Sequence, residues 1–273
     1  MKETFTVIGL VILAVALRHS RRKLVRKLGA LVFLAATFLA FYFCSGGMVC
    51  IGLTGVALWF FLPWIELLTR IRRMKLPLEN RLHHESPPAS SLIPNAPEAA
   101  VAMDDDGFDH VSDCAWRWDG MKQFFRLYWN PEERAVAAIC LCEQSDVTFA
   151  FISISSTTAC GKILRTTNFP FAPTLACPPD VLWNHLPCDC NCFHRILASH
   201  REWLEKKAIS HHDLRVPDSE TVEATIENEM SRLVRHNLGL GIIRLTGDGH
   251  FRYSPRGMFF LWGQFVKDMI RFC

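Results

Sequence analysis

A long run without a single charged side chain constrains this sequence more than any other feature. From Leu28 to Ile65 there is no Asp, Glu, Lys, Arg or His. As one helix the run would be about 57 Å long, nearly twice the hydrocarbon thickness of a bilayer. Ser45-Gly46-Gly47 interrupts it near the middle, and two glycines after a serine favour a turn over a helix interior. We therefore predict a helical hairpin that spans a membrane at about 28–44 and 48–68.

Basic residues flank the predicted hairpin at both ends and indicate its orientation. The preceding run contains Arg18, Arg21, Arg22, Lys23, Arg26 and Lys27, and the following run contains Arg70, Arg72, Arg73 and Lys75. Both runs lie on the same side of a hairpin, and cytoplasmic loops carry the excess of Lys and Arg. We expect an integral protein of an inner or plasma membrane, with the turn at Gly46 outside and everything after Lys75 in the cytoplasm.

A shorter apolar stretch, Phe5–Leu17, precedes the hairpin. It is shorter than the roughly 17–25 residues that a membrane span usually needs. Its arginines follow the apolar core, whereas a signal peptide carries its positive charge before the core. We expect a third, short span with the N-terminus outside. A buried or interfacial helix over the same residues is the alternative.

The composition after the second basic run is that of a soluble chain. Residues 76–107 are rich in Pro, Ser and Asp and have no periodicity, which predicts a flexible linker. Residues 108–273 then form a cytoplasmic α+β domain. Within it, apolar or aromatic runs separated by turn residues predict strands over Met121–Trp129, Ala135–Cys142, Val147–Ser155 and Lys162–Thr167. The short connections favour an antiparallel meander, and the nearly continuous apolar character of its middle strands indicates cover on both faces.

Helices are predicted in the second half of the domain. A Pro-rich loop over 168–187 leads to Asp189–Lys207, and Ser219–Asn237 follows; both carry apolar side chains at spacings of three and four. Met258–Phe272 is a final apolar helix. It either packs into the domain or lies on the inner leaflet of the membrane.

A short hairpin separates the last two helices. Its strands are Gly241–Leu245 and Phe251–Tyr253, joined by Thr246-Gly-Asp-Gly249. In outline, this helix–hairpin–helix resembles the recognition helix and wing of winged-helix proteins. The resemblance implies DNA-phosphate contacts from Arg232, Arg235, Arg244, Arg252 and Arg256. However, the same helix carries Glu220, Glu223, Glu227 and Glu229, which would repel DNA, so we expect an architectural role or protein contacts instead of nucleic-acid binding.

The eleven cysteines are more typical of free thiols than of a disulfide framework. Their number is odd, and several lie in apolar runs such as Val136–Cys142. Small buried thiols of this kind suit a reducing compartment, which agrees with a cytoplasmic domain.

One cluster contains the ligand types that zinc prefers: Cys188, Cys190, Cys192 and His194. Its spacing of one intervening residue differs from that of zinc knuckles, and no matching second knuckle follows. If Asp189 caps the next helix, Cys190 and Cys192 lie in its first turn, where the helix dipole lowers a thiol's pKa. Zinc binding and a redox-active thiol are therefore open alternatives, although we expect no cofactor.

Histidine spacing gives no second metal site. His194, His200, His211 and His212 do not place two imidazoles on one helical face, so we expect them at the surface or at the domain boundary.

The sequence contains no nucleophile elbow, phosphate-binding loop or dinucleotide fingerprint that would identify a reaction. The leading hypothesis is a membrane-anchored interaction or regulatory module whose domain binds a protein or a small ligand. A metal- or thiol-dependent enzyme or sensor using Cys188–His194 is the first alternative, and a membrane-tethered nucleic-acid binder is the second.

Overall fold

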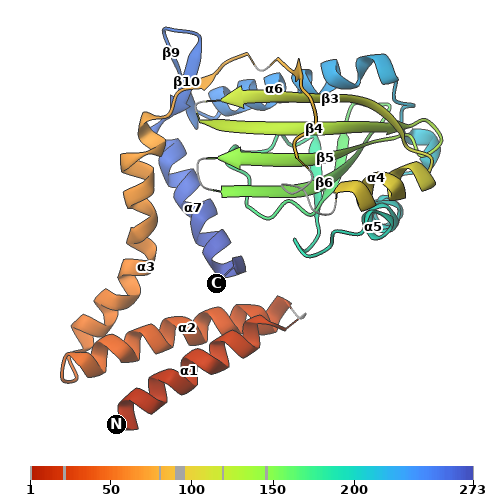
Figure 1. Cartoon of the computed structure of the whole chain (residues 1–273). Helices are drawn as coiled ribbons and strands as arrows, with labels where there is room; N and C mark the ends of the chain where they lie inside the picture. The colour runs from red at the N-terminus through yellow and green to blue at the C-terminus, as the bar shows by residue number, and fades with distance from the viewer. Residues whose placement is uncertain are drawn as a thin grey trace. The chain divides into compact units, whose positions relative to one another are not determined.

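The computed structural model describes residues 2–20, 23–79, 81–89, 96–118, 120–144 and 147–272. The chain divides into two compact units, and Figure 1 traces both. The helical unit comprises Met1–Met74, Ala172–Thr174 and Tyr253–Cys273. The α/β unit comprises Lys75–Phe171 and Leu175–Arg252. Each is described below by itself.

The helical unit begins with α1 (Lys2–Arg18), α2 (Lys23–Cys44) and α3 (Val49–Thr69), followed by the short η1 (Ile71–Arg73). α2 and α3 confirm two helices long and apolar enough to cross a membrane. The apolar stretch Phe5–Leu17 lies within α1, which is longer at both ends. In Figure 1, α1 and α2 lie side by side, whereas α3 leaves the intervening turn at a steep angle to α2.

The turn between α2 and α3 lies where the sequence predicts it. Gly46 and Gly47 have φ angles of 69° and 94°, which glycine adopts without steric cost. The Ser45 hydroxyl accepts a hydrogen bond from the Met48 N–H at 3.2 Å and so closes the turn. Ser-Gly-Gly therefore ends one helix and allows the next to begin.

The last helix, α7 (Pro255–Phe272), belongs to the helical unit and not to the domain in which the sequence analysis placed it. It contacts α3 through aromatic side chains. Periodicity predicted the helix correctly, but an apolar face does not specify which neighbour will cover it.

The α/β unit is built on a seven-stranded sheet of order β2-β3-β4-β5-β6-β7-β8. Its members are β2 (His83–His84), β3 (Asp109–Trp118), β4 (Met121–Asn130), β5 (Ala135–Gln144), β6 (Val147–Thr157), β7 (Ile163–Thr167) and β8 (Val181–His185). The predicted meander is confirmed as β4 to β7, all antiparallel. The sheet is larger than predicted, because β2 and β3 extend one edge and β8 adds a parallel strand at the other.

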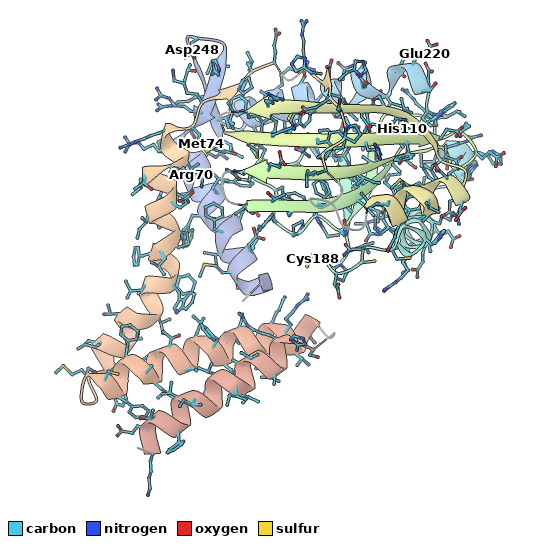
Figure 2. All side chains as sticks on the ribbon, in the orientation of Figure 1. Arg70, Met74, His110, Cys188, Glu220 and Asp248 are labelled. Carbon is cyan, nitrogen blue, oxygen red and sulfur yellow. The ribbon has the colours of Figure 1, made fainter. Side chains whose placement is uncertain are left out.

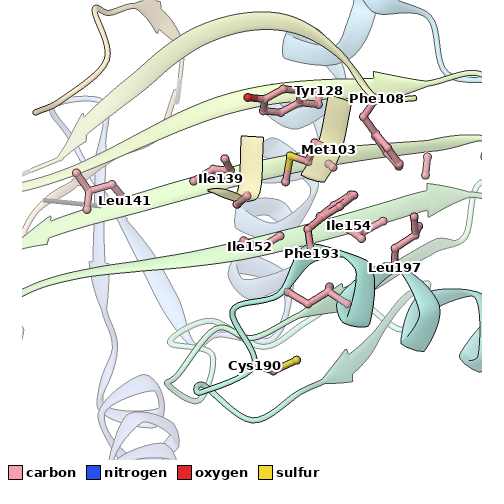
Figure 3. Packing of buried hydrophobic residues seen from close by; sticks show 14 of the residues in the cluster. Met103, Phe108, Tyr128, Ile139, Leu141, Ile152, Ile154, Cys190, Phe193 and Leu197 are labelled. Carbon is pink, nitrogen blue, oxygen red and sulfur yellow. The ribbon is translucent and has the colours of Figure 1, made fainter. Parts of the chain in front are cut away.

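Both faces of this sheet are covered, as the apolar middle strands predicted. α4 (Ala96–Asp105) and α5 (Phe193–Lys206) cover one face, where Met103, Phe108 and Phe193 pack on strand residues (Figure 3). α6 (Val222–Gly239) covers the other face through Val222, with Ile226 and Met230 beside it. The result is a helix–sheet–helix sandwich with two apolar cores.

Residues 76–107, expected to form a flexible linker, carry three elements of the α/β unit. β1 (Leu76–Pro77) pairs with β10, β2 pairs with β3, and α4 buries Ala99 and Met103. A two-residue strand is too short to show periodicity, and α4 is short and has two acidic residues in its last turn. These three elements therefore could not be predicted from composition. Residues 90–95 of this segment lie outside the described residues.

The predicted C-terminal hairpin is confirmed as β9 (Ile243–Thr246) and β10 (His250–Tyr253). It gains a third strand, because β1 pairs with β10 to give the order β1-β10-β9. α6 ends at Gly239, and Gly241 takes the left-handed conformation, with φ 67°, that turns the chain into β9. Two 3-10 turns, η3 (His211–Asp213) and η4 (Ser219–Thr221), connect α5 to α6.

Candidate functional site

The predicted metal-ligand cluster lies in the turn before α5, and the structure does not gather its side chains. Cys188 and Cys192 are exposed, and Figure 2 shows Cys188 in this turn. Cys190 is buried in the core beneath α5 beside Phe193 (Figure 3). His194 is exposed on the first turn of α5, where its Nδ1 lies 2.7 Å from Asp106 Oδ2. Cys190 is thus buried, whereas the other three side chains of the cluster are exposed.

The described residues contain no group of three or more His, Cys, Asp or Glu side chains arranged to hold a metal ion. To join Cys188 and Cys192 as a ligand, Cys190 would have to leave the core. Asn168 opposes such a movement, because its side-chain amide donates to the carbonyl of Cys190 at 3.0 Å and to Asn191 Oδ1 at 3.1 Å. The arrangement therefore does not fit a zinc site.

The condition for activation of Cys190 by a helix dipole, a helix capped by Asp189, is not met. α5 begins at Phe193 with Cys192 as its N-cap residue, so Asp189 lies before the helix and does not cap it. Burial raises the pKa of the Cys190 thiol above its ordinary value. Pro187 and the turn after it delay the helix, because Cys190 N–H bonds to the carbonyl of Pro187 instead of to a helical partner.

The buried cysteines of the sheet are chemically quiet. Cys114 of β3 and Cys142 of β5 are buried free thiols, and burial raises the pKa of each to about 12. Both are therefore protonated at neutral pH, and a protonated thiol is a poor nucleophile. These cysteines act as small apolar side chains, as the sequence predicted.

The most developed polar network of the α/β unit surrounds His200, which the sequence analysis expected near the surface. His200 lies on α5 and is buried between two hydroxyls, with Nε2 3.1 Å from Ser156 Oγ and Nδ1 2.8 Å from Thr166 Oγ1. Asn184 extends the network by donating to Thr166 Oγ1 at 3.3 Å and to Ser199 Oγ at 3.2 Å. The imidazole thus joins α5 to β6 and β7, and Asn184 connects β8 to the same network.

The sequence contained a signal for this burial. His200 follows Phe193, Ile196 and Leu197 on the same helical stripe, which packs on the sheet. Burial lowers the pKa of His200 to about 4, so the imidazole is neutral at neutral pH. A neutral imidazole beside a serine can act as a base, but His200, Ser156 and Thr166 are all buried away from solvent. The geometry therefore favours a structural role over nucleophilic catalysis.

A second polar cluster joins the sheet to α6. The Arg165 guanidinium on β7 donates to Glu229 Oε2 at 2.5 Å and lies 5.3 Å from the ring centre of Trp183 on β8. Arg232, one turn further along α6, pairs with Asp180 before β8. Each cation has a carboxylate partner, so this cluster stabilises the contact between α6 and the sheet.

The resemblance to a winged helix does not extend to the packing. In that fold, helices that precede the recognition helix pack against it, but here α5 and α6 cover opposite faces of one sheet. α6 also packs on the sheet, and Arg232 forms an ion pair with Asp180. The helix, the hairpin and the last helix follow one another in sequence, but α7 belongs to the helical unit and α6 to the α/β unit.

The apolar surface of α2 and α3 is the remaining feature that requires a functional explanation. Among the described residues, 11% of the most apolar stretch of α2 and 17% of that of α3 are buried within the protein. Where the two helices meet, Gly52 and Gly55 face the rings of Phe38 and Phe41. Their other faces expose large side chains, among them Leu31, Leu53, Phe61 and Ile65. No family model matches this chain, and no curated protein or solved structure matches it either.

Proposed function

We propose that the chain is an integral membrane protein that holds its α/β unit at the cytoplasmic face of an inner or plasma membrane, where the unit binds a protein or a small ligand. The observation that carries the proposal is the exposure of α2 and α3. Core helices of soluble proteins bury their apolar side chains, whereas these two leave most of theirs uncovered. A bilayer would cover them.

The basic runs support the orientation. The first run lies around the connection between α1 and α2, and the second lies at η1, after α3. With α1, α2 and α3 all crossing, both runs fall on one side, and the excess of Lys and Arg marks that side as cytoplasmic. A cleaved signal sequence would account for one apolar helix but not for two in succession.

The internal chemistry of the α/β unit supports binding over catalysis. His200, Arg165 and Cys190 are the titratable groups in the most developed clusters, and each is engaged in holding elements together. A metal- or thiol-dependent activity would require the Cys188–His194 turn to rearrange, so we do not advance it as a second function. The proposal names no cofactor.

Two experiments test the anchor and its orientation. In isolated membranes, the chain should remain in the pellet after alkaline carbonate extraction, and release into the supernatant would contradict the anchor. Exposed cysteines report the orientation: Cys44 and Cys50 flank the turn proposed to be outside, and Cys160 lies on the α/β unit. In intact cells, after mild reduction, a membrane-impermeant maleimide should label Cys44 and Cys50 but not Cys160.

The matched control is the Cys44→Ser, Cys50→Ser variant, which should lose labelling in intact cells and keep it after permeabilisation. Labelling of Cys160 in intact cells would reverse the proposed orientation while leaving the anchor intact. The two parts of the proposal can therefore fail separately.

A further inference from the structure

The C-terminal helix α7 lies against the candidate span α3. The ring of Phe259 meets that of Trp64 edge-on, with 5.0 Å between centres, and Trp262 stacks on Trp64 at 6.5 Å. The Trp262 indole N–H donates to the backbone carbonyl of Phe60 at 2.7 Å. Two separate kinds of contact thus join the helices.

The hydrogen bond falls beside an irregular point of α3. Pro63 stands inside this helix and lacks the N–H that would bond to the carbonyl four residues earlier. In a bilayer, backbone groups near such a proline need partners from neighbouring helices. The carbonyl that loses its helical donor is that of Trp59, and Trp262 donates to the next carbonyl, that of Phe60. The contact therefore suits an apolar environment, where an indole N–H also needs an acceptor.

The face of α7 that makes this contact is apolar along its length and only partly buried. Phe259, Trp262, Val266 and Ile270 recur at spacings of three and four and so share one side of the helix. Phe259 is 63% exposed and Ile270 is 43% exposed. The opposite side carries Leu261 and Gln264, which are buried.

Basic residues border the apolar face. Arg256 and Lys267 are eleven residues apart, about three helical turns, and therefore fall on one line along the edge of the face. Both are exposed. An apolar stripe with a basic edge is the pattern of a helix that lies in the interface of a membrane containing anionic lipids.

The depth of the contact agrees with this pattern. Ile65 is the last residue of the uncharged run, and Phe60 precedes it by five residues, or about 7.5 Å of helix. Interfacial helices bury their apolar face about 5–10 Å below the headgroups.

We propose that α7 lies in the cytoplasmic leaflet beside α3, with Phe259 and Ile270 among the acyl chains and Arg256 and Lys267 at anionic headgroups. The inference rests on the proposed membrane anchor and adds a second attachment, at the other end of the chain.

Photo-crosslinking in the full-length protein tests this placement. A diazirine analogue of phenylalanine is introduced at Phe259, at Leu53 of α3 or at Val101 of α4, which are 63%, 57% and 60% exposed. Each variant is reconstituted in vesicles of phosphatidylcholine and phosphatidylglycerol, and lipid adducts are measured by mass spectrometry. We expect lipid adducts at Phe259 within about threefold of those at Leu53, and at least about tenfold fewer at Val101.

The outcomes separate the inference from the anchor. Adducts at Leu53 but not at Phe259 would overturn the placement of α7 and leave the anchor standing. No adducts at either position would contradict both. Equal adducts at Phe259 and Val101 would also overturn the placement, because the signal would then not depend on the membrane. In vesicles of phosphatidylcholine alone, the yield at Phe259 should fall severalfold while that at Leu53 stays constant.

Discussion

His200 is a titratable group enclosed by neutral partners. Ser156 and Thr166 each approach one ring nitrogen, and neither can compensate a positive charge as a carboxylate would. Burial disfavours the charged form and outweighs the attraction of Glu133, which lowers the pKa of His200 to about 4. The α/β unit therefore folds around a neutral imidazole.

Acidification should destabilise the fold through this residue. The unfolded chain binds a proton at His200 near pH 6.5, whereas the folded chain binds it near pH 4. Between these values the unfolded state binds more protons, so the free energy of unfolding falls as pH falls. The loss is about 3 kcal/mol by pH 4 and absent above about pH 6.5. Denaturation midpoints of the detergent-solubilised full chain between pH 4 and 7.5 measure it.

Substitution isolates the contribution of His200 from that of the carboxylates. His200→Gln should be less stable than wild type at pH 7.5, by about 1–3 kcal/mol, because Ser156 and Thr166 lose hydrogen-bond partners. The difference should shrink towards pH 4. His194→Gln, at an exposed histidine, is the control for replacing a histidine by glutamine. An unchanged slope in His200→Gln would mean that folding does not lower the pKa of His200.

The Arg165–Glu229 pair should behave as a buried pair does. The side chains are 22% and 17% exposed, so removing one partner leaves a poorly solvated charge. Arg165→Met should lower the free energy of unfolding by about 2–4 kcal/mol, and the double variant Arg165→Met, Glu229→Met should cost less than the sum of the single changes. Lys206→Met breaks the exposed pair with Glu202 and should cost less than about 0.5 kcal/mol. Denaturant titration of Arg165→Met, Glu229→Met, the double variant and Lys206→Met measures these costs, and additive costs of the two single changes would exclude coupling.

The contact between α2 and α3 depends on two glycines. A side-chain Cβ at Gly55 would lie 2.5 Å from Cγ of Phe41 and 3.1 Å from its Cβ, positions that the ring cannot vacate by a small rotation. Gly55→Val should therefore push the helices apart and destabilise the helical unit by about 1–3 kcal/mol. Gly9→Val is the matched control, since nothing lies within 4 Å of that position.

Thermal aggregation of the full chain in detergent measures this effect. Adding Phe41→Ala to Gly55→Val should recover part of the loss, because the smaller side chain makes room for the valine. Equal melting of Gly55→Val and wild type would show that α2 and α3 do not pack as the structure describes.

The strands that sequence predicted correctly share a clear local signal. β4 to β7 are apolar or aromatic runs bounded by turn residues such as Asn130-Pro131, and their short connections determined their antiparallel order. β3 was not predicted as a strand, because Asp109, His110 and Asp113 give its first half a polar composition. β8 was not predicted as a strand, because it lies within a Pro-rich segment and is only five residues long. β3 and β8 form strands because they pair with neighbouring strands, which local composition does not reveal.

The candidate site was less predictable than the fold, because it depends on where side chains point. The pattern Cys188, Cys190, Cys192 and His194 suggested shared ligands, but the N-terminus of α5 begins later than predicted and turns Cys190 into the core. Conversely, the position of His200 on the apolar stripe of α5 predicts burial, but a histidine was expected at the surface because its side chain is polar. Its partners Ser156 and Thr166 are distant in sequence, and only the sheet brings them together.

The chain as a whole passes several times between its two units. It leaves the helical unit at Met74, returns for Ala172–Thr174, and returns again at Tyr253 to form α7. Within the helical unit, the N–H of Ala172 bonds to Asp268 of α7 at 2.8 Å. The membrane connection proposed for the chain is therefore not a single tether, because the chain passes between the two units at four places along the sequence.

The orientation of such an assembly should follow from the charges beside α3. Replacing Arg70, Arg72, Arg73 and Lys75 by Gln, and Met48 and Val49 by Lys, moves the excess of Lys and Arg to the other end of the span. Because the basic run before α2 remains, we expect a mixture of orientations, with Cys160 labelled from outside in part of the population. Replacing Arg70, Arg72 and Arg73 by Lys keeps the charge and should leave Cys160 protected. Full protection of Cys160 in the Gln variant would mean that the fold of the α/β unit, and not the flanking charge, determines the orientation.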